Sequence, residues 1–256
     1  MKKLFVLATA SLVLVSSVSA QFATSVVSYD KGLGSSSGFT NTSVVLGEPS
    51  RINPFTEPTD VFDPPYGKNQ ILSVGEGGSL VVQFAKPILN HPKNRFGIDF
   101  MIFGNAGFII TNDFDLNTFS WVGTPATDGS LFAANDGVTR VSVSEDGTNF
   151  FQLDPNLAPT VDGLFPTDGA GDFHTPVDPT LTQGDFAGLT FDQIRAFYYG
   201  SGGGTGYDIT WARNAQGRKV HLGSVSFVRI DVLSGKSEID AVSAVFLPGK
   251  PGKGKN

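Results

Sequence analysis

Apolar and polar residues alternate with a period of two in several short segments, which is typical of β-strands that bury one face. Residues 141–153 show the pattern most clearly: valines alternate with serines, Asp146-Gly147 forms a tight turn, and Phe150-Phe151 begins a return strand. The same alternation recurs at residues 80–84, 98–103, 138–143, 227–232 and 239–246. These segments predict an all-β protein.

Segments rich in Gly, Ser, Pro and Asn separate the predicted strands, at residues 32–43, 49–67 and 155–188. The last of these is long enough to be a surface excursion that is functional or mobile. One short helix is predicted after Thr190, because Thr190 and Gln193 can form a capping box and Gly200 can end the helix after Tyr199. No repeat or composition break indicates a second domain, so residues 21–247 are predicted to form one β-sandwich.

The first twenty residues have the composition of a secretory signal peptide. Lys2 and Lys3 precede an apolar run, and Val18-Ser19-Ala20 supplies the small residues that signal peptidase requires. The apolar run is shorter than a membrane anchor needs. We therefore expect cleavage near Ala20 and a secreted or cell-surface protein with no membrane span in the mature chain. The Gly, Pro and Lys residues of 248–256 predict a disordered basic tail.

Charge and cysteine content narrow the possible partners. The chain has no cysteine, so an exported form must be held by its hydrophobic core or by a metal instead of disulfides. Without Lys2 and Lys3, sixteen basic residues remain against 24 acidic ones, a formal charge of −8. This balance argues against nucleic acid and anionic membrane surfaces as partners.

Seven short motifs follow one another in a recognisable order. They are L-G-E-P-S at 46–50, V-G-E-G-G-S-L-V-V-Q-F at 74–84, G-I-D-F-M-I-F-G-N at 97–105, V-S-V-S-E-D-G at 141–147, G-G-T-G-Y-D at 203–208, F-V-R-I-D-V at 227–232 and E-I-D-A-V at 238–242. This order resembles a broad group of secreted bacterial cell-surface proteins whose domain is similar to the discoidin or galactose-binding jelly roll. The resemblance covers most of residues 24–247 and implies a jelly-roll β-sandwich that binds a ligand without catalysis.

Two positions depart from the pattern of that group. Ser50 stands where an acidic residue often follows the proline of the first motif, and Gly104 stands where a glutamate often precedes the asparagine of the third. Glu48 offers a compensating carboxylate for the first change only. Metal ligands of the group therefore do not transfer strictly to this chain.

Calcium is the metal that the residue types favour, because cysteine is absent, the three histidines are widely separated, and Asp and Asn are frequent in loops. Asp113, Asp115 and Asn117 alternate as they do at the start of a calcium loop. Thr118 stands where that loop needs glycine and Thr124 where it needs glutamate, so an EF-hand is rejected. A looser calcium loop and a series of Asx-turns remain as alternatives.

A second candidate calcium site consists of Asp99, Asp208 and Asp240. Asp99 and Asp240 interrupt otherwise apolar strands, where a carboxylate needs a partner or solvent. Asp208 follows a glycine-rich loop that permits close backbone approach. In one alternative, the carboxylates point to solvent from a sheet with one solvent-exposed face. In the other, they form an ion pair with Arg229.

Aromatic residues near loops are the candidate ligand-binding residues. Trp121, Tyr199, Tyr207 and Trp211 have polar edges, and sugars present apolar faces that stack on rings. Tyr207 and Trp211 flank Asp208, which combines rings with a hydrogen-bond acceptor. The alternative is that Trp211 packs under the sandwich and Tyr199 caps the helix.

No catalytic residue is predicted, because no nucleophile elbow, phosphate loop, dinucleotide fingerprint or zinc-protease motif occurs in the sequence. We expect an exported, calcium-stabilised binding module that recognises carbohydrate or a surface polymer. The alternatives are a structural envelope or matrix protein without a soluble ligand, and a polysaccharide-active hydrolase that uses a carboxylate pair. An aromatic-lined concavity would favour binding, and a flat face with exposed edge strands would favour assembly.

Overall fold

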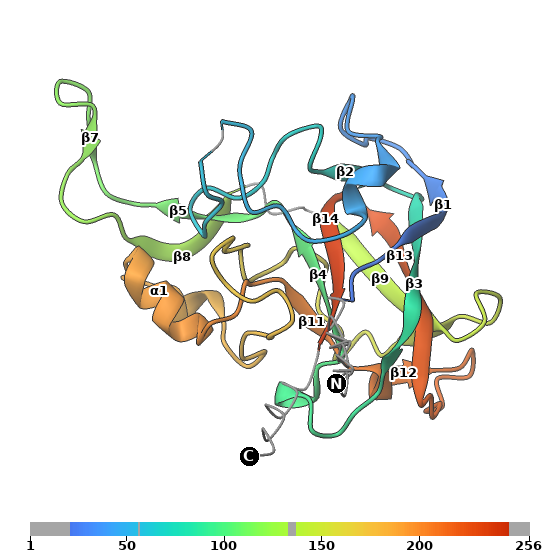
Figure 1. The fold of residues 1–256 in the computed structure, drawn as a ribbon. Helices are drawn as coiled ribbons and strands as arrows, with labels where there is room; N and C mark the ends of the chain where they lie inside the picture. Colours follow the sequence, from blue (N-terminus) through green and yellow to red (C-terminus); the bar gives the residue numbers. More distant parts are fainter. Residues whose placement is uncertain (1–20, 56, 133–136, 246–256) are drawn as a thin grey trace, which may run out of the picture.

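The computed structural model describes residues 21–55, 57–132 and 137–245, and it shows an all-β sandwich with one short α-helix (Figure 1). The predicted fold class is confirmed. The predicted signal peptide at 1–20 and the basic tail at 248–256 lie outside the described residues. In the described part, no helix is both long and apolar enough to cross a membrane.

The larger sheet has six antiparallel strands. Their order across the sheet is β1 (Ser25–Asp30), β3 (Ser79–Leu89), β13 (Ser224–Ser234), β9 (Val138–Ser144), β10 (Phe151–Leu153) and β12 (Ala212–Arg213). Three of the five segments predicted from alternation lie here, in β3, β9 and β13. The strands that are distant in sequence lie side by side, so this sheet cannot form until both ends of the domain are present.

The second sheet has four antiparallel strands, which contain the other two predicted segments. Their order is β11 (Thr205–Tyr207), β4 (Phe100–Gly104), β14 (Lys236–Ala244) and β2 (Leu72–Gly75). The β14 register shifts between Ile239 and Ala241, which places a bulge at Asp240. Both faces of this sheet are buried, because long loops cover its outer side. It therefore does not have the solvent-exposed face considered for Asp99 and Asp240.

The turn between β9 and β10 follows the sequence prediction. The Asp146 carboxylate accepts hydrogen bonds from the backbone N–H groups of Thr148 and Asn149, at 2.8 Å each. These bonds hold the pKa of Asp146 well below its usual value. Gly147 takes a positive φ of +74°, which a glycine adopts without steric cost. The acidic-glycine pair therefore closes this hairpin.

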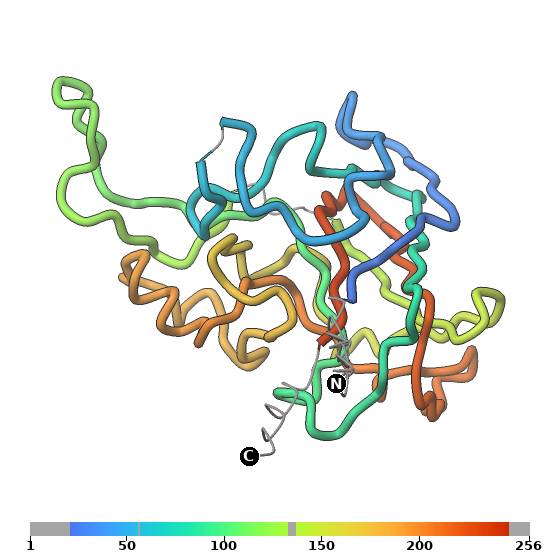
Figure 2. The backbone as a smooth tube through the Cα atoms, viewed as in Figure 1, coloured from blue at the N-terminus to red at the C-terminus, as the bar shows by residue number. Residues whose placement is uncertain are grey.

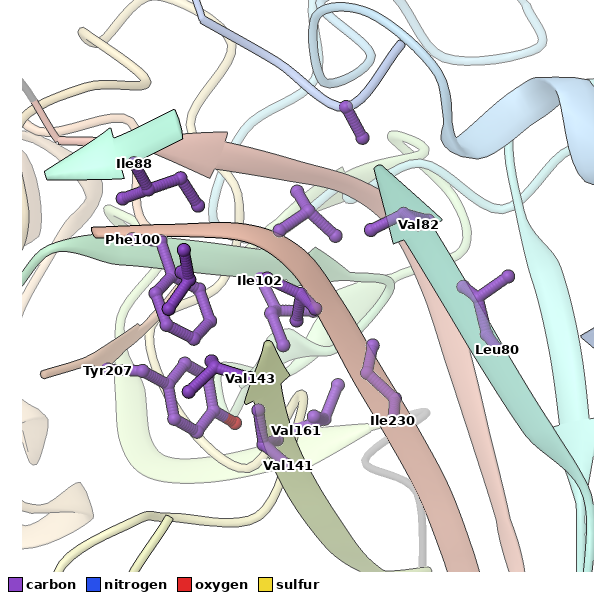
Figure 3. Packing of buried hydrophobic residues seen from close by; sticks show 14 of the residues in the cluster. Leu80, Val82, Ile88, Phe100, Ile102, Val141, Val143, Val161, Tyr207 and Ile230 are labelled. Atoms are coloured by element: carbon purple, nitrogen blue, oxygen red, sulfur yellow. The ribbon is translucent and has the colours of Figure 1, made fainter. Parts of the chain in front are cut away.

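The main core lies between the two sheets (Figure 3). Leu80, Val82 and Ile230 of the larger sheet face Phe100 and Ile102 of the smaller one. All five side chains are buried. Burying each side chain of this size stabilises the fold by about 1.5–3 kcal/mol. This core explains how the domain is held without disulfides.

A second layer lies beside the smaller sheet and contacts its outer face through Phe173, which packs with Met101 and Phe103 of β4. It contains helix α1 (Phe191–Tyr198), the 3-10 turn η3 (Gln183–Phe186) and the segment 155–188. Its own apolar cluster consists of Val61, Phe108, Phe165, Val177, Phe186, Ile194 and Tyr198. The predicted excursion is therefore packed, because its scattered apolar residues are buried although they have no periodicity.

Helix α1 begins as predicted and ends one residue earlier than expected. Thr190 and Gln193 form the capping box, with the Gln193 side chain accepting from the Thr190 N–H at 2.9 Å. Tyr199 already adopts the left-handed cap conformation with φ of +49°, and Gly200 follows with φ of +85°. An aromatic residue thus stands where glycine is usual.

An arm, defined as residues 107–132, projects from the body of the molecule (Figure 2). It leaves through β5 (Gly107–Ile110), continues through β6 (Phe114–Asp115) and β7 (Ser120–Trp121), and returns through β8 (Thr127–Phe132). Phe108 anchors its base, because this ring is buried in the second cluster and its backbone N–H donates to Val61 O at 2.8 Å. The far end extends well beyond that cluster (Figure 1).

Candidate functional site

Three aromatic rings meet at the arm tip, defined as residues 113–122. Phe114 and Trp121 are directly paired across β6 and β7, and their ring centroids are 5.0 Å apart in an edge-to-face arrangement. Phe119 packs edge-on against Phe114 at 5.3 Å. Phe119 is 81% exposed and Trp121 38% exposed. The rings therefore pack on one another while much of their surface remains in water.

The turn at the tip is held by Asp115. Its Oδ1 accepts from the Asn117 backbone N–H at 2.8 Å and from Asn117 Nδ2 at 3.1 Å. These hydrogen bonds, led by the backbone bond, lower the pKa of Asp115 below its usual value. This is the Asx-turn alternative for residues 113–117. Phe119 then takes a left-handed φ of +52°, which is unusual for a bulky residue.

The middle of the arm is joined by the side chain of Asn112. Its Nδ2 donates to Val122 O at 3.0 Å and to Thr124 O at 3.1 Å, and its Oδ1 accepts from Ala126 N at 2.8 Å. One amide thus connects both strands of the arm. The three rings are presented on a pre-organised support, which reduces the ordering cost of binding.

The chemistry of the arm tip suits an uncharged partner. No Lys or Arg occurs in residues 107–132, whereas Asp113 and Asp115 lie at the tip. The hydroxyls of Thr118 and Ser120 lie 2.9 Å apart beside the rings. Aromatic faces next to small polar groups match the alternating apolar and polar faces of a neutral sugar.

A pocket of about 540 Å³ lies between segment 155–188 and residues 205–211, which include β11, and Trp211 forms part of its wall. Leu157, Leu164, Phe165 and Leu181 supply other apolar walls, and Thr160 and Thr205 supply hydroxyl groups. Among the described residues that line this Trp211 pocket, none is charged. It is an aromatic-lined concavity, the feature that favours binding over assembly.

Tyr207 does not line the Trp211 pocket. It is fully buried, stacks on Phe100 at 5.3 Å, and donates from its hydroxyl to Pro159 O at 3.1 Å. Burial raises its pKa well above the usual value. Tyr207 therefore supports the segment that forms the pocket. Trp211 itself is partly buried against two apolar clusters as well as lining the pocket.

The remaining predicted aromatic residue, Tyr199, caps helix α1 and lies beside Arg95. It is 74% exposed, and its ring centroid is 5.7 Å from the Arg95 guanidinium carbon. The structure thus distributes the four predicted aromatic residues over four places: the arm tip, the pocket wall, the core and the end of α1.

Asp99 and Asp208 lie close together, but their carboxylates accept hydrogen bonds from different donors. Asp99 Oδ1 accepts from His91 N at 3.1 Å and Asn94 Nδ2 at 2.7 Å, and its Oδ2 accepts from Ile209 N at 2.9 Å. Burial, with a smaller effect of the Asp208 charge, raises the pKa of Asp99 to about 6. Asp208 caps the turn η4 (Ile209–Trp211) by accepting from the Thr210 N–H at 2.6 Å.

Asp240 belongs to a different place in the smaller sheet. Asp99 precedes the start of β4, whereas Asp240 lies beside Ile239, which pairs with Gly104 at the end of β4. The Asp240 carboxylate accepts from Ser50 N at 2.7 Å and from Ser50 Oγ at 2.9 Å. Burial raises its pKa to about 7. The three aspartates therefore do not converge on one ion.

The two departures from the motif pattern both contact buried carboxylates. Ser50 is the hydrogen-bond partner of Asp240, as described above. A Cβ on Gly104 would lie 2.2 Å from Asp162 Cγ, because the Asp162 carboxylate occupies the space of a side chain at position 104. Asp162 accepts from Asn105 N and from Ala106 N, at 3.1 Å each. Asp162 lies in the segment without periodicity, so its sequence gave no signal of this role.

Glu238 is a further buried acid that sequence reasoning missed. It accepts from Ser36 Oγ at 2.5 Å, Asn105 Nδ2 at 2.7 Å and Lys236 Nζ at 3.0 Å. Burial alone would raise the pKa of Glu238, but these hydrogen bonds and the Lys236 charge outweigh it and lower the pKa. The alternating sequence K-S-E-I-D shows acidic positions in β14 but not their distant partners.

Arg229 pairs with Asp231 at 2.7 Å, so it does not serve the three predicted aspartates. In residues 21–55, 57–132 and 137–245, no three His, Asp or Glu side chains are grouped as a metal site requires. Calcium therefore stays a prediction from sequence. No known protein family and no curated protein gives a significant match to this chain.

Proposed function

We propose that this chain is an exported, non-catalytic binding module that contacts a neutral carbohydrate polymer through the arm tip. The observation that carries the proposal is the exposed cluster of Phe114, Phe119 and Trp121 at the end of a projecting arm. These rings belong to none of the three apolar clusters of the described residues. An exposed apolar patch of this kind marks an interaction surface.

The neighbouring groups support a sugar as the partner. Each ring can stack on the apolar face of a pyranose, while the hydroxyls of Thr118 and Ser120 are placed to exchange hydrogen bonds with sugar hydroxyls. The carboxylates of Asp113 and Asp115 disfavour an anionic polymer at this surface. The Trp211 pocket provides a second neutral, aromatic-lined surface on the same chain.

Secretion is part of this proposal and rests on the sequence of residues 1–20. Calcium has no role in the proposed contact, because Asp115 holds its own turn and no described cluster surrounds an ion. Comparing the unfolding midpoint in excess chelator with that in added calcium tests the calcium prediction separately, since an ion that binds only the folded state raises the midpoint.

The test is depletion of residues 21–256 from solution by insoluble neutral polysaccharides, with cellulose, chitin and β-1,3-glucan as probes. We expect at least one of them to bind the chain, and the combined Phe114→Ala, Phe119→Ala and Trp121→Ala variant to bind about tenfold or more weakly, a loss of about 1.4 kcal/mol. Phe55→Ala is the matched control, because Phe55 is 74% exposed but lies outside the arm.

Equal depletion of the triple variant and the unchanged chain would overturn the arm tip as the binding surface. Binding to none of the three polymers, together with concentration-dependent self-association that the triple variant loses, would instead support the structural-assembly alternative. Circular dichroism of each variant checks that the sandwich is intact.

A further inference from the structure

Arg95 differs from most arginines of this protein because it has no acidic partner. Of the seven arginines in the chain, five form ion pairs with carboxylates: Arg51, Arg140, Arg195, Arg213 and Arg229. Within the described residues, Arg95 and Arg218 form none. An unpaired guanidinium is notable in a chain whose acidic residues outnumber its basic ones.

Two aromatic rings hold the Arg95 guanidinium. Its central carbon is 4.9 Å from the centroid of the Phe96 ring and 5.7 Å from that of Tyr199. Both rings are exposed, Phe96 by 45% and Tyr199 by 74%. Contact with the ring faces favours a cation there and restricts the side chain without using its N–H groups.

The N–H groups of Arg95 remain largely available. The guanidinium makes one described hydrogen bond, from Nη1 to Tyr199 O, and this bond is long at 3.5 Å. Asp208 is the acid beside the neighbouring Gly97, but its carboxylate accepts from the Thr210 N–H and makes no ion pair with Arg95. A planar fork of donors with few partners matches a carboxylate in geometry.

Both flanking aromatic residues adopt an unfavourable backbone conformation. Phe96 has φ of +58° and Tyr199 has φ of +49°, the left-handed region in which glycine is preferred. Strained residues of this kind persist where the surrounding structure enforces them, and they occur often at ligand sites. The left-handed conformations of Phe96 and Tyr199 place two rings next to one cation.

Hydrogen bonds to Asp99 hold the start of the turn that carries Arg95. His91 N and Asn94 Nδ2 both donate to Asp99, and Asn94 is buried. The 3-10 turn η2 (Arg95–Gly97) follows directly. Asp99 thus fixes the start of the turn. Lys93 is exposed two residues before Arg95 and adds a second positive charge.

We propose that Arg95, Phe96 and Tyr199 form a second binding site, which takes the carboxylate of an acidic sugar residue. The guanidinium receives the carboxylate through two parallel N–H bonds, and the exposed rings pack against the apolar face of the sugar. This site lies outside the arm and the Trp211 pocket and goes beyond the proposed function. Its ligand carries a negative charge, whereas both other surfaces suit neutral sugars.

The test is calorimetric titration of residues 21–256 with trigalacturonate, with the neutral trisaccharide maltotriose as the uncharged comparison. We expect trigalacturonate to bind the unchanged chain, and Arg95→Gln to weaken binding by about 10-fold or more, as expected for loss of a charged hydrogen-bonding partner. Arg218→Gln is the matched control, because Arg218 is exposed and unpaired but has no ring contact. Acetate tests whether a carboxylate without a sugar is enough for binding. At a concentration equal to that of trigalacturonate, acetate should not compete with trigalacturonate for the site.

Tyr199→Gly separates binding from folding. Glycine relieves the left-handed conformation at position 199, so the unfolding midpoint should stay the same or rise, while trigalacturonate binding is weakened. The proposal is overturned if Arg95→Gln binds trigalacturonate as tightly as Arg218→Gln does, if maltotriose binds equally well at this site, or if trigalacturonate does not bind. Each of these results leaves the arm tip untouched, because the triple arm variant tests that surface separately.

Discussion

An aromatic pair in the sandwich and one on the arm have nearly the same ring separation, although the first is stacked and the second edge-to-face, and their surroundings are opposite. Phe100 and Tyr207 are 5.3 Å apart and fully buried between the sheets, whereas Phe114 and Trp121 are 5.0 Å apart and exposed. The first pair contributes to folding by removing apolar surface from water. The second pair leaves that surface available. The comparison shows that the environment of a ring, and not its packing against another ring, indicates whether it is free for a ligand.

The largest expected effect is on the stability of the core. Phe100→Ala should lower the free energy of unfolding by about 3–5 kcal/mol, because it removes a buried ring and leaves a cavity. Phe119→Ala at the arm tip should change it by about 0.5 kcal/mol or less, as is usual for exposed positions. Urea denaturation followed by circular dichroism measures both values. A comparable loss in the two variants would show that the arm rings belong to the folding core.

A smaller loss is expected from a methyl group placed against the buried carboxylate of Asp162. Gly104→Ala puts a Cβ 2.2 Å from Asp162 Cγ, so either the carboxylate or the strand must move. We expect a loss of about 1–3 kcal/mol, the usual cost of overpacking. Gly223→Ala is the control, since a Cβ there has no neighbour within 4 Å. Equal unfolding midpoints for the two variants would contradict the position assigned to Asp162.

The buried and the exposed carboxylates should respond to pH in different ways. Burial raises the pKa of Asp240 to about 7, so the folded state binds a proton that the unfolded state releases near its ordinary value of 3.8. Between these values, the contribution of Asp240 to stability falls as pH rises, by at most about 1.4 kcal/mol per pH unit. Asp115 on the arm has the opposite shift, a lowered pKa.

Asp240→Asn removes this titration, because an amide does not ionise. Its stability relative to the unchanged chain should therefore increase as pH rises from 5 to 7. Thermal unfolding at several pH values measures the difference between the two proteins. A difference that stays constant over this range would mean that Asp240 titrates at its ordinary pKa in the folded state.

The sandwich could be predicted from sequence because burial on one side of a strand imposes a period of two. The short helix was predictable because Thr190 and Gln193 are only three residues apart. Features that depend on distant contacts were not. Asp240 meets Ser50 across 190 positions, and Arg95 meets Tyr199 across 104. No local pattern in the sequence contains that information.

The arm tip shows a second limit, which is local. Trp121 was predicted as a sugar-binding residue and Asp115 as a calcium ligand, in two separate arguments. The structure brings both into one turn, where Asp115 accepts from Asn117 and the ring of Trp121 contacts Phe114. The turn depends on the left-handed conformation of Phe119, which an aromatic residue does not signal in a sequence.

The most direct test of the arm as the binding surface uses the only two tryptophans of the chain, Trp121 and Trp211. In Trp211→Phe, fluorescence reports the arm tip alone, and in Trp121→Phe it reports the pocket alone. Titration with a soluble fragment of the neutral polymer that depletes the protein should give a saturable emission change in Trp211→Phe, lost when Phe114 and Phe119 are also alanine. A saturable change confined to Trp121→Phe, or none in either protein, would contradict the assignment of binding to the arm.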